Sequence, residues 1–210
     1  MSDLTNHPIS PRGDDDKPIS QRVQHQPVSA RVPERVARGV FSTGQLVLDS
    51  PKEFCIDFLY GLSRPYQVVG RVIMVPATMT EFTSALEHNL SLYQQNFGAL
   101  PVTPTPVVPP PPPPKPTIEE IYQNFKLPDD LLPGAYANSV MISHSATEFC
   151  FDFIAGFYPT SVVASRVIVS APTAPRLLNT LKGSIANWRS RPPATLGPQS
   201  PGSPADQPPT

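Results

Sequence analysis

The sequence predicts an α+β fold made of two tandem β-β-β-α repeats that form an intramolecular pseudo-dimer. Three observations predict it: proline is concentrated outside two segments of similar length, a hexapeptide of the first segment recurs in the second, and both segments place strand-like patterns before a helix-like one. Because a unit of about 60 residues buries little apolar surface by itself, we expect the copies to share an antiparallel sheet that carries both helices on one face.

Proline marks the boundaries of the two copies. The chain has 210 residues, of which 30 are Pro, and proline is excluded from helix and sheet interiors because it lacks an N–H group and fixes φ. The proline-poor segments 39–98 and 134–191 are therefore the predicted folded repeats, copy 1 and copy 2. We expect residues 1–38 and 192–210 to be disordered tails, and residues 99–133 to be a proline-rich linker with a short helix.

The linker combines a proline run with a short helical pattern. The prolines at 109–114 favour polyproline II, which makes a semi-rigid spacer; a ligand for a proline-binding domain is the alternative. Residues 117–127 begin with a capping box, Thr117 with Glu120, and carry an apolar face. We expect this helix to dock on a folded copy, with a contact site for another protein as the alternative.

The internal repeat is the strongest signal in the sequence. EFCIDF at 53–58 recurs as EFCFDF at 148–153, and RVI at 71–73 recurs at 166–168. Both matches have the same shift of 95 residues, as does the match of Gly39 with Gly134. A fixed shift over this length indicates duplication of one structural unit.

Each copy contains the same predicted elements. A first extended segment, 40–49 in copy 1, precedes the hexapeptide, which alternates apolar and polar residues as a strand does. A third strand rich in β-branched residues follows at 67–75. An amphipathic helix ends the copy, and its predicted caps are Thr78 with Glu81 in copy 1 and Thr173 in copy 2.

The repeated residues resemble a bacterial family of unknown function, the domain-of-unknown-function 3467 family. Its pattern runs Tyr-Ala-Asn, Ser-x-x-Glu-Phe-x-x-Asp-Phe, Ser-Arg-Val-Ile, and then an amphipathic helix. Copy 2 has YAN at 136–138, SATEFCFDF at 145–153 and SRVIVS at 165–170; copy 1 has SPKEFCIDF at 50–58 but FST at 41–43. The resemblance implies a small cytoplasmic bacterial protein, usually with a single copy, and it brings no established activity.

Six charged residues, three in each copy, form the strongest candidate constellation: Glu53, Asp57, Arg71, Glu148, Asp152 and Arg166. The two-residue period puts Glu53 and Asp57 on one face of the second strand, and Arg71 follows on the third. We interpret Asp57 with Arg71 as an ion pair that fixes strand register. A ligand site is the first alternative and a catalytic carboxylate pair the second. No catalytic residue is predicted, because no His recurs beside these groups.

Copy 2 offers a candidate binding surface, composed of Tyr136, Asn138, Arg176, Lys182, Arg189 and Arg191. The last four lie on or after its predicted helix. A small basic helix face is usually a solvated face, and contact with phosphate groups is the alternative.

The cysteines and histidines predict neither a metal nor a cofactor. Cys55 and Cys150 occupy equivalent positions and are interpreted as half-buried thiols in a reducing compartment, with a response to oxidation as the alternative. The four His do not recur between the copies and share no short ligand spacing.

Composition and charge narrow the class of function. No apolar run approaches the length of a membrane span, and the first ten residues contain no apolar signal segment. A net charge of −1 gives no general attraction to nucleic acid. We expect a cytoplasmic, non-enzymatic interaction or scaffold module that binds a protein partner. The alternative is a nucleic-acid-binding protein that uses the sheet face or the basic helix of copy 2.

Overall fold

The computed structural model describes residues 30–62, 64–100, 117–157 and 159–191. The proline run at 109–114 and most of both predicted tails lie outside the described residues. The elements in chain order are α1 (Glu34–Ala37), β1 (Val40–Ser42), β2 (Gly44–Asp49), β3 (Phe54–Tyr60), β4 (Tyr66–Met74), α2 (Pro76–Phe97), α3 (Ile118–Gln123), β5 (Phe125–Lys126), the 3-10 helix η1 (Asp129–Leu131), β6 (Ala135–Tyr136), β7 (Ser139–His144), β8 (Glu148–Phe157), β9 (Thr160–Ser170), the 3-10 helix η2 (Ala171–Thr173) and α4 (Ala174–Arg189). The predicted α+β class is confirmed.

The strands form two sheets, not one shared antiparallel sheet as the sequence predicted. One sheet has the order β1-β9-β8-β7; the other has the order β2-β3-β4-β5, with β6 also paired to β4. The hairpins within each copy are antiparallel, but β1 runs parallel to β9, and β5 and β6 run parallel to β4. The prediction of a purely antiparallel sheet is therefore wrong, because each sheet gains parallel edge strands from elsewhere in the chain.

The first extended segment of each copy divides between the two sheets. Residues 40–49 form β1, which joins the sheet of copy 2, and β2, which joins the sheet of copy 1. Copy 2 does the same: β6 pairs with β4 of copy 1, and β7 pairs with β8. Apolar residues stand on both sides of each break, so the sequence pattern alone indicates one strand.

Two equivalent segments, residues 30–42 and 125–137, carry out this exchange, and we call them the first and second arm. The first arm includes α1 and an Arg31–Val162 bridge, so its residues 30–38 are ordered where the sequence predicted a tail. The second arm contains β5 and η1, which lie within the predicted linker, and β6, which lies at the start of predicted copy 2. Pairing with the other copy gives these segments the hydrogen bonds that their own copy does not supply.

The predicted linker helix forms as α3 and is docked on copy 1. Thr117 and Glu120 make both bonds of the capping box, at 2.8 and 3.2 Å. The chain after α3 then continues into β5, where Phe125 packs on Tyr66 with ring centroids 5.8 Å apart. This outcome agrees with the prediction of a docked helix.

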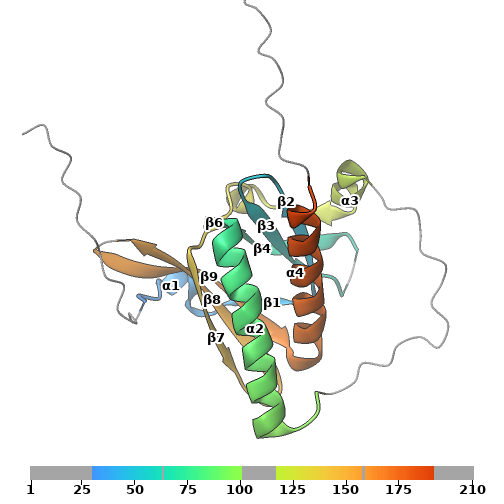
Figure 1. Ribbon diagram of the computed structural model, residues 1–210. Helices are drawn as coiled ribbons and strands as arrows, with labels where there is room; N and C mark the ends of the chain where they lie inside the picture. The colour runs from blue at the N-terminus through green and yellow to red at the C-terminus, as the bar shows by residue number, and fades with distance from the viewer. Residues whose placement is uncertain (1–29, 63, 101–116, 158, 192–210) are drawn as a thin grey trace, which may run out of the picture.

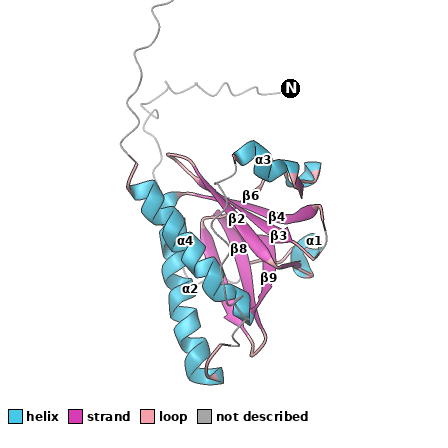
Figure 2. Cartoon of the chain, turned by 90° about the vertical axis from the view of Figure 1, so that its right-hand side faces the viewer, coloured by secondary structure: helices cyan, strands magenta, loops and turns pink. Residues whose placement is uncertain are grey.

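Helices α2 and α4 lie side by side over one side of the sheets (Figure 1), and Figure 2 shows α1 and α3 on the other side. Each long helix covers the other copy. Phe82 of α2 contacts Phe151 and Phe153 of β8 with centroids 5.6 and 5.5 Å apart, and Trp188 of α4 contacts Phe54 of β3 at 6.0 Å. The buried side chains of both copies therefore form one core cluster.

The starts of the long helices differ from the sequence prediction. Helix α2 begins at Pro76, with Val75 as its N-cap, two residues before the predicted capping box at Thr78. Thr173 precedes α4 but makes no capping bond from its side chain. Proline in the first turn begins each helix, because its fixed φ suits that position and its missing N–H costs nothing there. Within the described ranges, no helix is long and apolar enough to cross a membrane.

Candidate functional site

A cleft of about 660 Å³ is lined by residues of β4 and β9 and of the short helices α1 and η1, and Figure 2 shows α1 on the side of the sheets away from the long helices. Equivalent residues of the two copies face each other across it, and the short helices α1 and η1 form its walls. Its lining residues are Arg35, Val36, Gly39, Val40, Gln67, Val68, Val69, Gly70, Arg71, Pro128, Asp130, Leu131, Gly134, Ala135, Ala164, Ser165 and Arg166.

Two arginines in the cleft lining, Arg71 and Arg166, each form a bidentate ion pair with an aspartate of the neighbouring strand. Arg71 donates from Nε and Nη2 to the two carboxylate oxygens of Asp57, at 2.7 and 2.8 Å. Arg166 donates in the same way to Asp152, at 2.6 and 2.7 Å. The residues of each pair are directly opposite in the strand register, as the sequence suggested. The hydrogen bond to Asp57 raises the pKa of Arg71, so the guanidinium stays charged.

The arginines also hold the exchanged arms, a role that sequence reasoning missed. Arg71 donates from Nη1 to the carbonyl oxygen of Leu132, at 3.3 Å, and Arg166 donates to that of Ala37, at 3.1 Å. These carbonyls occupy equivalent positions at or just after the ends of η1 and α1. A cation at a helix C-terminus stabilises the free carbonyl groups there.

Close passage of the arms over the arginines requires glycine. Gly39 has φ of +66°, and a Cβ there would lie 2.9 Å from Cγ of Arg166. Gly134 has φ of +70°, and a Cβ there would lie 2.8 Å from Cδ1 of Ile73. The match of these two glycines, visible in the sequence, therefore marks where each arm crosses the other copy's strand.

The two Asp–Arg pairs differ in one contact. Tyr122 of α3 donates its hydroxyl hydrogen to Oδ2 of Asp57 at 2.5 Å and accepts a bond from Nη2 of Arg71 at 2.9 Å. The Arg71 guanidinium also lies 5.8 Å from the centre of the Tyr122 ring. The repeat comparison could not show this contact, because the residue 95 positions before Tyr122 is Pro27.

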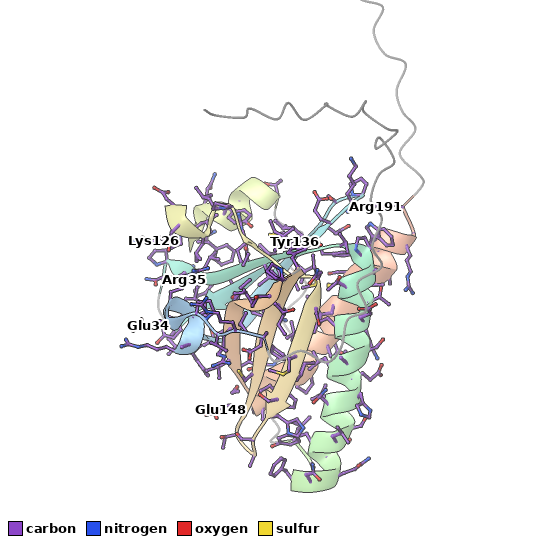
Figure 3. All side chains as sticks on the ribbon, turned by 90° about the vertical axis from the view of Figure 1, so that its left-hand side faces the viewer. Glu34, Arg35, Lys126, Tyr136, Glu148 and Arg191 are labelled. Carbon is purple, nitrogen blue, oxygen red and sulfur yellow. The ribbon has the colours of Figure 1, made fainter. Side chains whose placement is uncertain are left out.

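The predicted carboxylates Glu53 and Glu148 lie outside both ion pairs. The two side chains are exposed, and Ser50 and Ser145 accept hydrogen bonds from their backbone N–H groups. Figure 3 shows Glu148 at the opposite end of the strands from Tyr136. Cys55 and Cys150 are half-buried free thiols, and burial with the nearby Asp57 raises the pKa of Cys55 to about 11.

The predicted binding surface of copy 2 is divided between two places. Tyr136 lies on β6 with its ring stacked on Phe157, at a centroid distance of 5.8 Å, and the Asn138 side chain bonds both backbone groups of Gly156. The basic residues Arg176, Lys182 and Arg189 lie on α4, and Arg191 follows it. Lys182 pairs with Glu87 at 2.5 Å and Arg191 with Asp49 at 2.7 Å. Lys182 and Arg191 therefore join the C-terminal helix region to copy 1, and the two parts of the predicted surface do not make one site.

Among the described residues, no group of three or more His, Cys, Asp or Glu side chains has an arrangement that would hold a metal ion. The cleft lining carries the guanidinium groups of Arg35, Arg71 and Arg166 and the carboxylate of Asp130, and Arg71 and Arg166 are each paired with an aspartate. Residues of this kind can bind polar groups of a ligand by hydrogen bonding.

The fold and cleft thus define a two-copy α+β protein with a candidate binding site between its halves. The family model described as "Protein of unknown function (DUF3467)" matches residues 11–102 and again 110–192. The chain belongs to this family and contains two consecutive copies of its domain. Each matched range includes one arm, so the arms are part of the family's domain. Comparison with curated proteins finds no match to the chain.

Proposed function

We propose that the chain is an intramolecular pseudo-dimer and that it works as a non-enzymatic interaction module, whose central cleft binds an extended segment of a protein partner. The pseudo-dimer is supported by contacts that repeat at equivalent positions. Each arm pairs with the other copy's last strand, each long helix covers the other copy's sheet, and both arginines bind an arm carbonyl. A single-copy relative would achieve the same arrangement as a homodimer.

The cleft carries the proposed binding role. Its volume of about 660 Å³ lies within the usual range of binding sites, and apolar side chains alternate along it with a few polar ones. Two lining residues already bind polypeptide within this chain, since Arg71 and Arg166 hold backbone carbonyls, and Asp57, the partner of Arg71, accepts a hydrogen bond from a tyrosine hydroxyl. A partner segment would present the same groups. The guanidinium groups stay charged, which suits hydrogen bonding to a partner more than proton transfer.

The charge around the cleft favours a protein partner over a polyanion. Arg71 and Arg166 are each neutralised by an aspartate, and Arg35 and Asp130 occupy equivalent places on opposite walls. Nucleic acid would instead need cations that are free to meet phosphates. The arms cover part of the outer sheet faces, and Lys182 and Arg191 of the basic helix are engaged with copy 1. We place the interaction in the cytoplasm, where free thiols such as Cys55 and Cys150 persist.

The test compares baits that differ only in the cleft. The full chain and its Ala164→Tyr variant, which fills the cleft, are used to capture partners from a lysate with and without nuclease. Ala186→Tyr makes the same change on the exposed face of α4 and serves as the matched control. A second pair, Arg35→Glu in the cleft wall and Arg38→Glu outside it, repeats the comparison at exposed positions that leave the core intact.

The expected result is a discrete protein that survives nuclease and binds the wild type and both controls, with at least tenfold loss for Ala164→Tyr and Arg35→Glu. Retention of the partner by both cleft variants would contradict the proposed site. Recovery of nucleic acid, with partners lost on digestion, would favour the alternative function.

A further inference from the structure

The Asp152–Arg166 pair of copy 2 has the same geometry as the Asp57–Arg71 pair but lacks its third partner. Both carboxylates accept two bonds from their arginine, at distances between 2.6 and 2.8 Å. In copy 1 a tyrosine hydroxyl completes the cluster. In the described part of copy 2, Arg166 supplies every hydrogen bond that the Asp152 carboxylate accepts.

The burial of the two pairs agrees with this difference. The side chains of Arg71 and Asp57 are 12% and 0% exposed, whereas those of Arg166 and Asp152 are 24% and 5% exposed. The sequence that precedes the first arm has no aromatic counterpart of Tyr122. Residues 1–29 contain no Tyr, Phe or Trp, and Pro27 stands at the position equivalent to Tyr122.

We propose that Asp152 and Arg166 form a receptor site for a tyrosine side chain of a partner protein. The phenol would donate its hydroxyl hydrogen to Oδ2 of Asp152, accept a bond from Nη2 of Arg166, and lie against the guanidinium, as Tyr122 does in copy 1. A phenol suits this pair because it supplies both a donor and an acceptor from one atom, and its ring favours a cation beside it. The inference rests on the proposed function, since Arg166 lines the cleft, and it names the chemistry of the partner.

The tyrosine site does not include the strand position that follows α3. In copy 1, Lys126 pairs with Gln67 of β4; in copy 2, Arg31 of the first arm already holds the equivalent place beside Val162. In copy 1, Phe125 packs on the ring of Tyr66, but the equivalent residue in copy 2 is Ser161, which has no ring to pack on. A ligand that models the site should therefore end near Gln123.

The test uses the capped peptide TIEEIYQ, residues 117–123, and the same peptide with Tyr122→Phe. Each is titrated into the full chain labelled with ¹⁵N, and the Nε–H signals of the arginines are followed by NMR. The Arg166→Lys variant removes one of these signals and so assigns it. We expect a saturable shift of the Arg166 signal with the Tyr peptide and about tenfold or weaker binding of the Phe peptide, because a hydrogen bond to a charged group is lost.

The inference is overturned by no shift at millimolar peptide, by equal shifts with both peptides, or by a shift confined to Arg71, which would mean exchange with α3 at copy 1. These outcomes are separate from the cleft test. If Ala164→Tyr loses the partner while the Arg166 signal does not shift with the peptide, the proposed function stands and only the tyrosine site is disproved.

Discussion

Phe58 of β3 and Phe153 of β8, which hold the same position in the two copies, contact each other with ring centroids 5.5 Å apart. Contact between equivalent residues means that the copies meet at this point, and both rings are almost completely buried. Both strands also have a register shift directly after these residues. The interior of the molecule is therefore built from both copies at once.

Truncation at this contact is the first prediction. Phe58→Ala should lower the free energy of unfolding by about 3–5 kcal/mol, because it removes a large buried side chain and leaves a cavity. Phe153→Ala should cost a similar amount. The double variant should lose less than the sum, since the second truncation enters a cavity that already exists. Urea unfolding followed by circular dichroism measures all three. Phe157→Ala, at a ring that is 59% exposed, is the control and should cost under about 1 kcal/mol.

Separation of the copies is the second prediction. When fragments 1–105 and 106–210 are produced apart, each loses the long helix that covers its sheet and the arm that pairs with its last strand. Each fragment should be unfolded or should form a homodimer, and mixing should restore a 1:1 complex with the spectrum of the intact chain. Size exclusion with light scattering distinguishes these states. Two folded monomeric fragments that do not bind each other would disprove the prediction that each copy needs the other to fold.

Local patterns predicted the elements that depend on local physics. The repeated hexapeptide located β3 and β8, and the interpretation of Asp57 with Arg71 as an ion pair agrees with the strand register and the contact. The capping box at Thr117 located α3. All these features involve residues that are near in sequence or face each other within one hairpin.

Exchange between the copies could not be predicted in this way. β1 pairs with a strand more than a hundred residues away, and the break at Thr43 follows from that pairing and not from a proline or a charged residue. Residues 30–38 contain four charged residues and a proline and looked like a tail, because their partners lie in copy 2. Tyr122 lies in the linker helix, whose docking the sequence analysis attributed to an apolar face, yet its hydroxyl donates a hydrogen bond to Asp57.

Removal of the Tyr122 hydroxyl is the third prediction. Tyr122→Phe keeps the ring but removes the donor to Asp57 and the acceptor for Arg71, so it should lower the free energy of unfolding by about 1–2 kcal/mol. Tyr136→Phe is the matched control, since that ring is 40% exposed and is held by stacking on Phe157. Thermal unfolding of both variants checks the difference. Equal melting temperatures for the two would show that the hydroxyl contact adds nothing.

Replacement of the two arginines by lysine is the fourth prediction. Lysine cannot reproduce the bidentate bond to aspartate and also reach the arm carbonyl. Arg71→Lys should destabilise by about 2–4 kcal/mol, because Arg71 also bonds Tyr122 and its side chain is only 12% exposed. Arg166→Lys should cost about 1 kcal/mol less, since it lacks the tyrosine contact. Denaturant midpoints measured in parallel decide the order, and a larger cost at Arg166 would contradict it.

The thiol of Cys55 provides the fifth prediction, which concerns pH. Burial, followed by repulsion from Asp57, raises its pKa from an ordinary 9.0 to about 11 in the folded state. The unfolded chain therefore releases this proton first, so the contribution of Cys55 to stability is complete below pH 9 and is lost as pH rises from 9 to 11. At pH 8 the buried thiol should also react with iodoacetamide at least about tenfold more slowly than glutathione, because thiolate is the reactive form.

Cys55→Ala separates this effect from the other groups that titrate at high pH. Its urea midpoint should fall less between pH 9 and pH 11 than the wild-type midpoint, whereas the two proteins should respond alike between pH 6 and pH 8. Cys150→Ala should give a change of the same sign, because burial also raises the pKa of Cys150. Two results would show that the fold does not hold the thiol protonated. One is a wild-type urea midpoint that responds to alkaline pH no more than the midpoint of Cys55→Ala, and the other is alkylation of Cys55 at pH 8 as fast as that of glutathione.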